Sequence, residues 1–174
     1  MVGGSESQSF EAWARASGTQ LRRAALLLTG DAHDADDLVQ DVMVRVFARW
    51  HRIRDMDSRE GYARRVLVNR HLSIGRRLQG FRARQHVLAA EESDPDEARN
   101  ATVVARRDLH RALMALGPRQ RAVVVLRYYL DLPDAQIAEL LECSPSTIRT
   151  QALRALAKLR QSVEIGEYDY GQER

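Results

Sequence analysis

The chain has 174 residues, 44% of them apolar, which is enough for one globular domain or two small ones. No apolar run approaches the roughly 18 residues of a membrane span, and the opening MVGGSESQSF does not resemble a signal peptide. A single cysteine, Cys143, excludes an internal disulfide and is typical of the cytoplasm, where we expect the protein to act.

Positive charge comes almost entirely from arginine. Lysine occurs once, at Lys158, while Lys and Arg together number 27. Guanidinium groups form planar pairs of hydrogen bonds with phosphates and base edges. The composition therefore favours an acidic partner such as nucleic acid.

The segment from Gly30 to Trp50 predicts an amphipathic helix whose acids precede its arginines, the order that a helix dipole favours. One stripe is apolar and expected to be core: Val39, Val42, Met43, Val46, Phe47 and Trp50. The opposite face carries Asp37, Gln40, Asp41, Val44 and Arg45. Val44 on that face indicates either a partner-binding surface or an isolated exposed valine, and the pattern leaves both open.

A second helix is predicted from Gly61 to Gln79. Its distinctive stripe consists of Tyr62, Arg65, Asn69, Ser73 and Arg76, flanked by Arg64, Arg70 and Arg77. An aromatic ring, an amide and several guanidinium groups on one helix are suited to stacking on and recognising single-stranded or distorted DNA. The alternative is a surface helix whose arginines lay their stems along apolar neighbours.

The next stretch, from Ala89 to Asn100, has five acids, one proline and one arginine, and it lacks apolar periodicity. It predicts a flexible acidic linker over residues 81–104. We therefore expect an all-α chain of two helical modules, residues 8–80 and 105–163, followed by a polar tail over residues 164–174. The acids of the linker either keep the two basic modules apart or merely keep the linker soluble, and the sequence leaves both open.

The last module ends in two helices joined by a tight turn. The first is predicted within Leu132–Glu142 with Asp134 as its cap, and the second starts with Ser144 as N-cap and Pro145 in its first turn. Ala138 is small enough for the two helices to pack closely. Glu142 stands in the turn where glycine is common, so a left-handed backbone is expected to be strained there.

The second of these helices has a one-sided composition. Its apolar face is Ile148, Ala152, Ala155, Leu156 and Leu159, and its polar face is Thr147, Thr150, Gln151, Arg154 and Lys158. No acid occurs from Cys143 to Arg160. A solvated face usually mixes both signs of charge, so this pattern predicts a helix-turn-helix whose second helix enters a DNA major groove.

Catalytic chemistry finds little support. The five histidines are scattered, and no HExxH, CxxC, phosphate-binding or dinucleotide-binding motif occurs. Cys143 precedes a helix cap, where a half-buried structural thiol is expected rather than a nucleophile. We therefore expect no enzyme activity, no catalytic residue, no metal site and no cofactor.

The order of these segments resembles a group 4, extracytoplasmic-function (ECF) sigma factor of bacterial RNA polymerase, of the actinobacterial sigma-E-like type. LLLTGDAHDADDLVQDVMVRVFARW resembles the core-binding part of sigma region two, and GYARRVLVNRHLSIGRR resembles its promoter-melting helix. The segment that starts with LHRALMALGPRQRAVVVLRYY and ends with the helix-turn-helix resembles sigma region four. Tyr62, Ser73 and Glu142 depart from the Trp, acid and Gly common in the family, which affects base preference rather than membership.

The resemblance implies a factor that binds the clamp and flap of core RNA polymerase, recognises the upstream (−35) and downstream (−10) promoter elements, and assists DNA melting. An anti-sigma factor is an expected further partner, and no membrane is expected. The implied polymerase contacts are Asp37, Gln40, Asp41, Val44 and Arg45. The implied upstream-element contacts are Ser146, Thr147, Arg149, Thr150, Gln151 and Arg154. The implied downstream-element contacts are Asp57, Ser58, Arg59, Tyr62, Arg65, Asn69, Arg70, Arg76 and Arg77.

A stand-alone helix-turn-helix regulator is the alternative from another class. It would account for residues 105–163 equally well, but it leaves the acidic Val44 face and the Asn69 stripe without a role. Binding to core RNA polymerase would distinguish the two.

Overall fold

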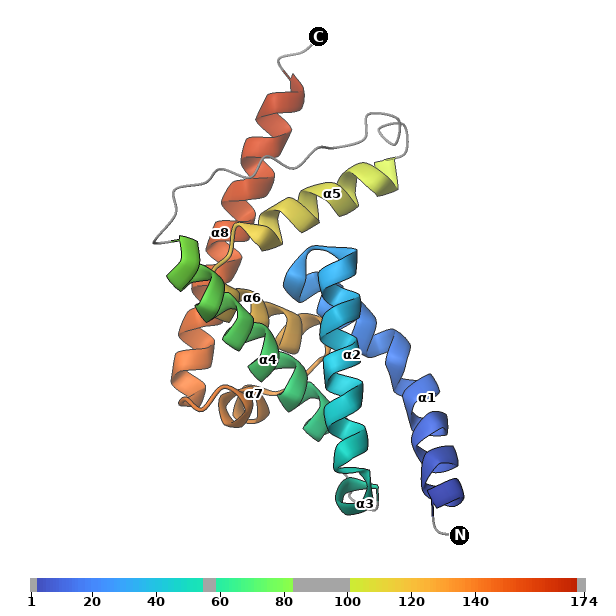
Figure 1. The fold of residues 1–174 in the computed structure, drawn as a ribbon. Coiled ribbons are helices and arrows are strands. Elements are labelled where there is room, and N and C mark those ends of the chain that lie inside the picture. The colour runs from blue at the N-terminus through green and yellow to red at the C-terminus, as the bar shows by residue number, and fades with distance from the viewer. Residues whose placement is uncertain (1–2, 55–58, 83–100, 172–174) are drawn as a thin grey trace.

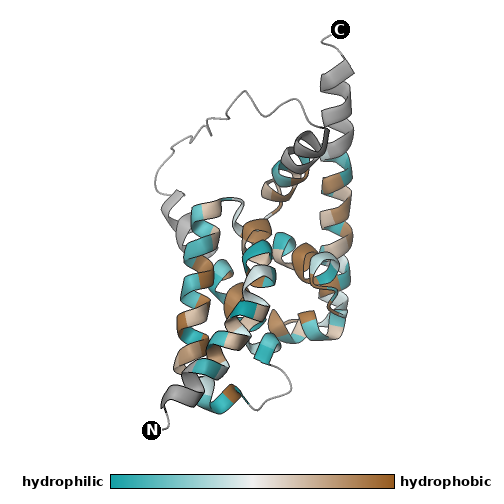
Figure 2. Ribbon diagram, turned by 90° about the vertical axis from the view of Figure 1, so that its right-hand side faces the viewer, coloured by the Kyte–Doolittle hydropathy of each residue, from teal (hydrophilic) through white to brown (hydrophobic). Residues whose placement is uncertain are grey.

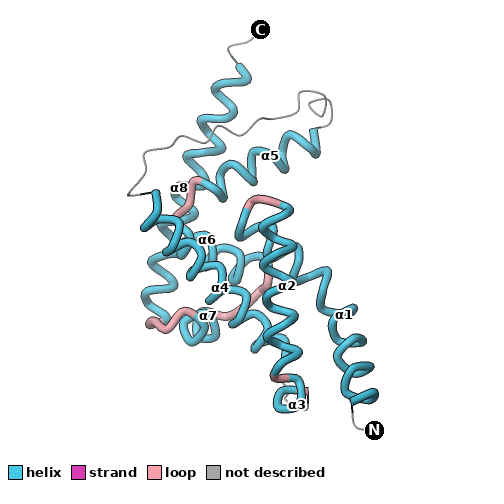
Figure 3. Tube along the Cα trace, viewed as in Figure 1, coloured by secondary structure: helices cyan, strands magenta, loops and turns pink. Residues whose placement is uncertain are grey.

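The computed structural model describes the backbone of residues 3–54, 59–82 and 101–171, and side chains within 8–54, 59–75 and 108–162. All regular secondary structure in these ranges is helical (Figure 3), which confirms the predicted all-α class. The N-terminal and C-terminal ends lie at opposite ends of the molecule (Figure 1).

The first module contains four helices in the described ranges: α1 (Gly3–Thr29), α2 (Ala32–Ala48), α3 (Trp50–Ile53) and α4 (Arg59–Arg82). Helix α1 was not predicted from the sequence. Gly30, with φ of 83°, reverses the chain after α1, and the Asp31 carboxylate then caps α2 by accepting from the Asp34 amide at 2.8 Å.

The core of this module lies where α1, α2 and α4 meet. Leu28, Leu38, Val42 and Leu67 are fully or almost fully buried there. At one end of this core, α1 meets the C-terminal end of α2 and the start of α3 through an aromatic cluster of Phe10, Trp13, Phe47 and Trp50. Its contacting ring centroids lie 4.9 to 5.9 Å apart.

The prediction that Phe47 belongs to the core was wrong. Its side chain remains 52% exposed. The ring packs against Phe10, but Phe47 lies at the margin of the apolar stripe, so much of its surface stays in solvent.

The second module comprises α5 (Ala101–Met114), α6 (Pro118–Val124), the π-helical turn η2 (Val125–Tyr129), α7 (Asp134–Leu140) and α8 (Pro145–Gly171). Helix α8 therefore continues beyond residue 163, where the sequence predicted a polar tail.

The predicted cap of α7 was also wrong. Pro133 occupies the cap position without a side-chain hydrogen bond. Asp134 is instead the first helical residue, and its carboxylate pairs with the Arg127 guanidinium at 3.4 Å.

The two modules pack directly against each other, contrary to the expectation that the linker acids keep them apart. One continuous buried cluster includes Leu67 and Val68 of α4 together with Ala122 and Val123 of α6. Gly75 of α4 faces Pro118 closely, since a Cβ atom there would lie 3.3 Å from the proline ring. The described part of the chain thus forms a single packed body.

Apolar and polar residues alternate in short stretches along the helices rather than in long apolar runs (Figure 2). Among the described residues, no helix combines the length and the apolarity needed to cross a membrane.

Candidate nucleic-acid interface

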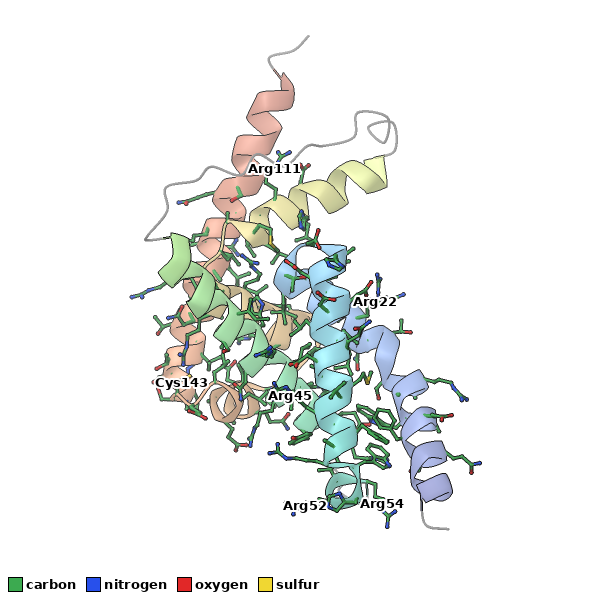
Figure 4. All side chains as sticks on the ribbon, in the orientation of Figure 1. Arg22, Arg45, Arg52, Arg54, Arg111 and Cys143 are labelled. Atoms are coloured by element: carbon green, nitrogen blue, oxygen red, sulfur yellow. The ribbon has the colours of Figure 1, made fainter. Side chains whose placement is uncertain are left out.

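A hollow of about 350 Å³ lies between α2 and α4. Four residues of the predicted α4 stripe line it together: Tyr62, Arg65, Asn69 and Ser73. Arg45 of α2 and Arg49, the residue that caps the C-terminal end of α2, also line it, and Figure 4 shows Arg45 where α2 and α4 face each other. Val66 and Arg70 complete the lining.

Arg49 is a lining residue that the sequence analysis missed. Its Nη1 donates a hydrogen bond to the Tyr62 hydroxyl at 2.6 Å, and its guanidinium carbon lies 5.9 Å from the centre of the tyrosine ring. This pair of contacts holds Tyr62 in one orientation. Arg49 follows Arg45 by one helical turn, and that spacing was the available sequence signal.

Asp41 connects α2 to α4. Its carboxylate accepts from Arg45 Nε at 2.9 Å and also lies 2.9 Å from Arg70 Nε. The hydrogen bond and charge of Asp41 raise the pKa of Arg45 above its usual value. Because Asp41 partly neutralises Arg45 and Arg70, the positive charge left for a ligand in the hollow comes mainly from Arg49 and Arg65.

The remaining predicted downstream-element contacts are only partly described. Asp57 and Ser58 lie outside the described residues. Arg59 begins α4, and its Nη1 donates to the Arg54 carbonyl oxygen at 3.1 Å. Arg76 and Arg77 belong to α4, but their side chains lie outside the described set.

The outward face of α2 exposes two large apolar side chains, one helical turn apart. Val44 is 67% exposed and Phe47 is 52% exposed. Asp37 and Gln40 beside Val44 are exposed as well, and exposed Arg45 lies at the edge of this face, where it also lines the hollow. A pair of neighbouring apolar residues with a polar rim favours a protein-binding surface over an isolated exposed valine.

The helix-turn-helix forms as predicted. Ser144 Oγ accepts from the Thr147 amide at 3.2 Å, so Ser144 caps α8. Glu142 has a φ of 51°, the left-handed conformation expected at this turn. The Arg119 guanidinium donates to the Leu141 carbonyl at 2.7 Å and so satisfies the end of α7.

Half-buried Cys143 lies at the junction between α7 and α8 (Figure 4). Its amide donates to the Ala138 carbonyl at 3.0 Å and helps to close the turn.

The outer face of α8 presents several side-chain hydrogen-bond donors, of which the Thr150 hydroxyl donates to the Ser146 carbonyl oxygen at 3.0 Å. Arg149, Thr150 and Arg154 are exposed and Gln151 is partly exposed. Within the described residues, the side chains of Arg149, Gln151 and Arg154 have no hydrogen bond or ion pair. The hydroxyls of Ser146 and Thr147 each lie 2.8 Å from Ser144 Oγ. The N-terminal turn is thus ordered internally. Within the described part of the chain, the guanidinium groups of Arg149 and Arg154 and the Gln151 amide are available to a ligand.

Two family profiles match the two modules separately. The sigma-70 region 2 profile matches residues 13–80, and the sigma-70, region 4 profile matches residues 106–159. The RNA polymerase sigma-E factor of Streptomyces avermitilis is 34% identical over 167 residues, an alignment that covers 94% of this chain and 90% of the relative. The ECF RNA polymerase sigma factor SigL of Mycobacterium tuberculosis is 33% identical, with 83% of this chain and 82% of the relative covered.

A solved structure supports the fold. The sigma factor RpoE of Bartonella quintana, determined in complex with the anti-sigma factor NepR, superposes with a TM-score of 0.72 at 20% identity. The match covers 90% of this chain and 97% of that one. Together with the profile matches to both modules, these relatives show that the chain belongs to the ECF group of the sigma-70 family, the RNA polymerase sigma factors of transcription initiation.

Proposed function

We propose that this sigma factor directs core RNA polymerase to promoters through two DNA-binding surfaces, one on each module. The observation that carries this proposal is the presence of both surfaces in one chain. One is a cation-lined hollow with an aromatic ring and an exposed amide, and the other is a helix whose exposed arginines have no acidic partner among the described residues. A stand-alone helix-turn-helix regulator would need only the second surface. Because the first module matches sigma-70 region 2, which such a regulator would not need, that alternative is not favoured.

The hollow between α2 and α4 suits an unstacked base of the downstream element. Tyr62 offers a ring held by Arg49, and exposed Asn69 offers an amide that can donate to and accept from a base edge. Arg49 and Arg65 supply charge for the backbone phosphates. The resemblance adds the other predicted contacts of this surface, namely Asp57, Ser58, Arg59, Arg70, Arg76 and Arg77.

Helix α8 suits the major groove of the upstream element. Gln151 and Arg154 can form paired hydrogen bonds with adenine and guanine edges, respectively. Arg149 and Thr150 are also exposed on this helix. We assign Ser146 and Thr147, in its N-terminal turn, to contacts with the phosphates. The helix would thus combine sequence recognition with backbone positioning.

The outward face of α2 is the proposed polymerase-binding surface. It contains the predicted Asp37, Gln40, Asp41, Val44 and Arg45, to which the structure adds exposed Phe47. We propose the clamp as its partner and the flap as the partner of the second module. An anti-sigma factor is a further proposed partner, supported by the similar fold of the sigma factor RpoE solved in complex with the anti-sigma factor NepR. We accordingly propose that the protein acts in the cytoplasm.

The test is transcription in vitro with core RNA polymerase and a promoter library randomised at both elements. We expect transcription to depend on this chain and Asn69→Ala to relax selection at the downstream element alone. Arg52→Ala, an exposed arginine on α3 outside the hollow, serves as the control. Binding to DNA without any polymerase-dependent transcription would contradict the proposal and favour the regulator.

A further inference from the structure

Leu153 is the most exposed large apolar side chain in the described part of the chain. It lies on α8, and 70% of its surface is accessible. Its neighbours along the chain, Ala152 and Arg154, are buried and exposed, respectively. No predicted role includes Leu153, and the core of the module does not use it.

The position of Leu153 places it among the proposed DNA contacts. It follows Arg149 by four residues and Thr150 by three, so all three lie on neighbouring positions of one helical face. Arg154 is 100° further around the same exposed side. The opposite side carries Ile148, Ala152 and Ala155, which are at most 1% exposed. Leu153 therefore points away from the core, in the middle of a face otherwise made of hydrogen-bond donors.

The charge of this surface restricts what Leu153 can contact. No acid occurs between Cys143 and Val163, so the face around Leu153 is cationic and suits a polyanion. Phosphates offer no favourable partner to an isobutyl group. Among the groups on base edges in a major groove, the C5 methyl of thymine is the apolar one.

We infer that Leu153 is a specificity-determining residue that contacts the C5 methyl group of a thymine in the upstream promoter element. This inference rests on the proposed docking of α8 in the major groove. It deepens that proposal by adding an apolar contact to hydrogen bonds from Gln151 and Arg154. It also predicts a position at which the base preference depends on one methyl group.

The experiment exploits deoxyuridine, which keeps the hydrogen-bonding groups of thymidine and lacks only the methyl group. Holoenzyme assembled from this chain and core RNA polymerase selects a preferred upstream element from a randomised library. Each thymine of that element is then replaced singly by deoxyuridine, and the dissociation constant of the promoter complex is measured. For the unaltered chain we expect about a fourfold loss at one thymine, the size of one buried methyl group.

The variant Leu153→Ala should bind the thymine-containing promoter about fourfold more weakly and show no further loss on deoxyuridine substitution. Alanine is the best helix former, so α8 should be retained, and circular dichroism checks this. The matched variant Arg154→Ala should weaken binding but keep the ratio between thymine and uracil. Restoring an apolar side chain with Leu153→Met should restore a preference for thymine.

Two outcomes would overturn the inference. One is an unaltered chain that discriminates no thymine from uracil. The other is a Leu153→Ala variant that discriminates thymine from uracil as strongly as the unaltered chain does. This outcome overturns the inference even if the variant binds core polymerase more weakly. Failure of the underlying proposal has a different signature, because alanine variants of Gln151, Arg154 and Leu153 would then all keep the wild-type ranking of upstream elements.

Discussion

His110 Nε2 donates a hydrogen bond to the carbonyl oxygen of Gly30 at 2.6 Å, and this contact joins α5 to the C-terminal end of α1. The guanidinium of Arg121 reinforces it by donating to the Leu28 carbonyl at 2.7 Å and to the Met114 and Leu116 carbonyls at 3.1 Å. The last carbonyls of a helix lack partners within the helix and carry partial negative charge. The second module therefore caps a helix of the first.

Replacing Gly30 should loosen this junction. An added Cβ would lie 2.3 Å from Met114 Sδ and 2.8 Å from His110 Nε2, at a φ of +83°. For Gly30→Ala we expect a loss of at least about 1–2 kcal/mol in the free energy of unfolding, since left-handed backbone alone costs that much for a residue with a side chain. Urea unfolding measures it.

Gly117→Ala is the matched control for that experiment. A Cβ at Gly117 would meet no atom within 4 Å, and its φ of −62° is ordinary for any residue. Its effect should stay within about 0.5 kcal/mol. Equal losses in the two variants would show that the crowding at Gly30 has no energetic weight.

His71 should make stability fall in mild acid. Burial, with the nearby charge of Arg121, lowers the pKa of His71 to about 4 from its ordinary value of 6.5. Between these values the unfolded chain binds a proton that the folded chain does not, so stability present above pH 6.5 is lost as the pH falls toward 4. From pH 7.5 to 5.5 the contribution is about 1.4 kcal/mol.

Urea midpoints at the two pH values test this expectation. His71→Leu should remove most of the histidine-dependent loss, because leucine stays neutral and the Nε2 of His71 has no hydrogen-bond partner to lose among the described residues. Exposed His51→Gln is the control and should leave the profile unchanged. A His71→Leu profile as steep as that of the unaltered chain would assign the acid sensitivity to other groups.

The exposed pair on α2 should bind core polymerase. Val44→Glu and Phe47→Glu each place a charge within the proposed apolar contact, so we expect core affinity to fall on the order of tenfold or more. Both residues are more than half exposed, so the fold should be retained. Gln20→Glu on the exposed surface of α1 is the control. Core affinity that stays unchanged in both α2 variants would exclude this face.

Alanine variants of Gln151 and Arg154 should change promoter selection differently from a variant that loses only a phosphate contact. Gln151→Ala is expected to relax selection at one position of the upstream element, with a discrimination loss of about 1–3 kcal/mol. Arg154→Ala should do the same if it contacts a base; a phosphate contact would weaken all promoters alike and lower the salt slope by about one unit. Selection from a randomised element at two salt concentrations separates these results. If both variants keep the wild-type ranking, α8 positions the protein without determining sequence preference.

The sequence by itself determined the features that depend on local spacing. The outward placement of Val44, the cap at Ser144, the left-handed turn at Glu142 and the shared face of Tyr62 and Asn69 follow from a period of 3.6 residues and the preferences of single residues. Local patterns also have limits. Phe47 fell within a wide apolar stripe yet lies at its exposed margin, and Asp134 pairs with Arg127 instead of capping α7.

Only the tertiary structure decided which distant residues meet. The contact of Arg49 with Tyr62, the bridge from Asp41 to Arg70 and the seating of Arg121 against Leu28 join separate helices. Nothing in the period of either helix specifies such a partner, because the pairing depends on how two helices cross and which side chains fill the space between them. The contact between the modules has the same origin. The linker charges alone suggested that the modules stay apart, but the apolar faces of α4 and α6 are buried against each other, which favours a packed arrangement.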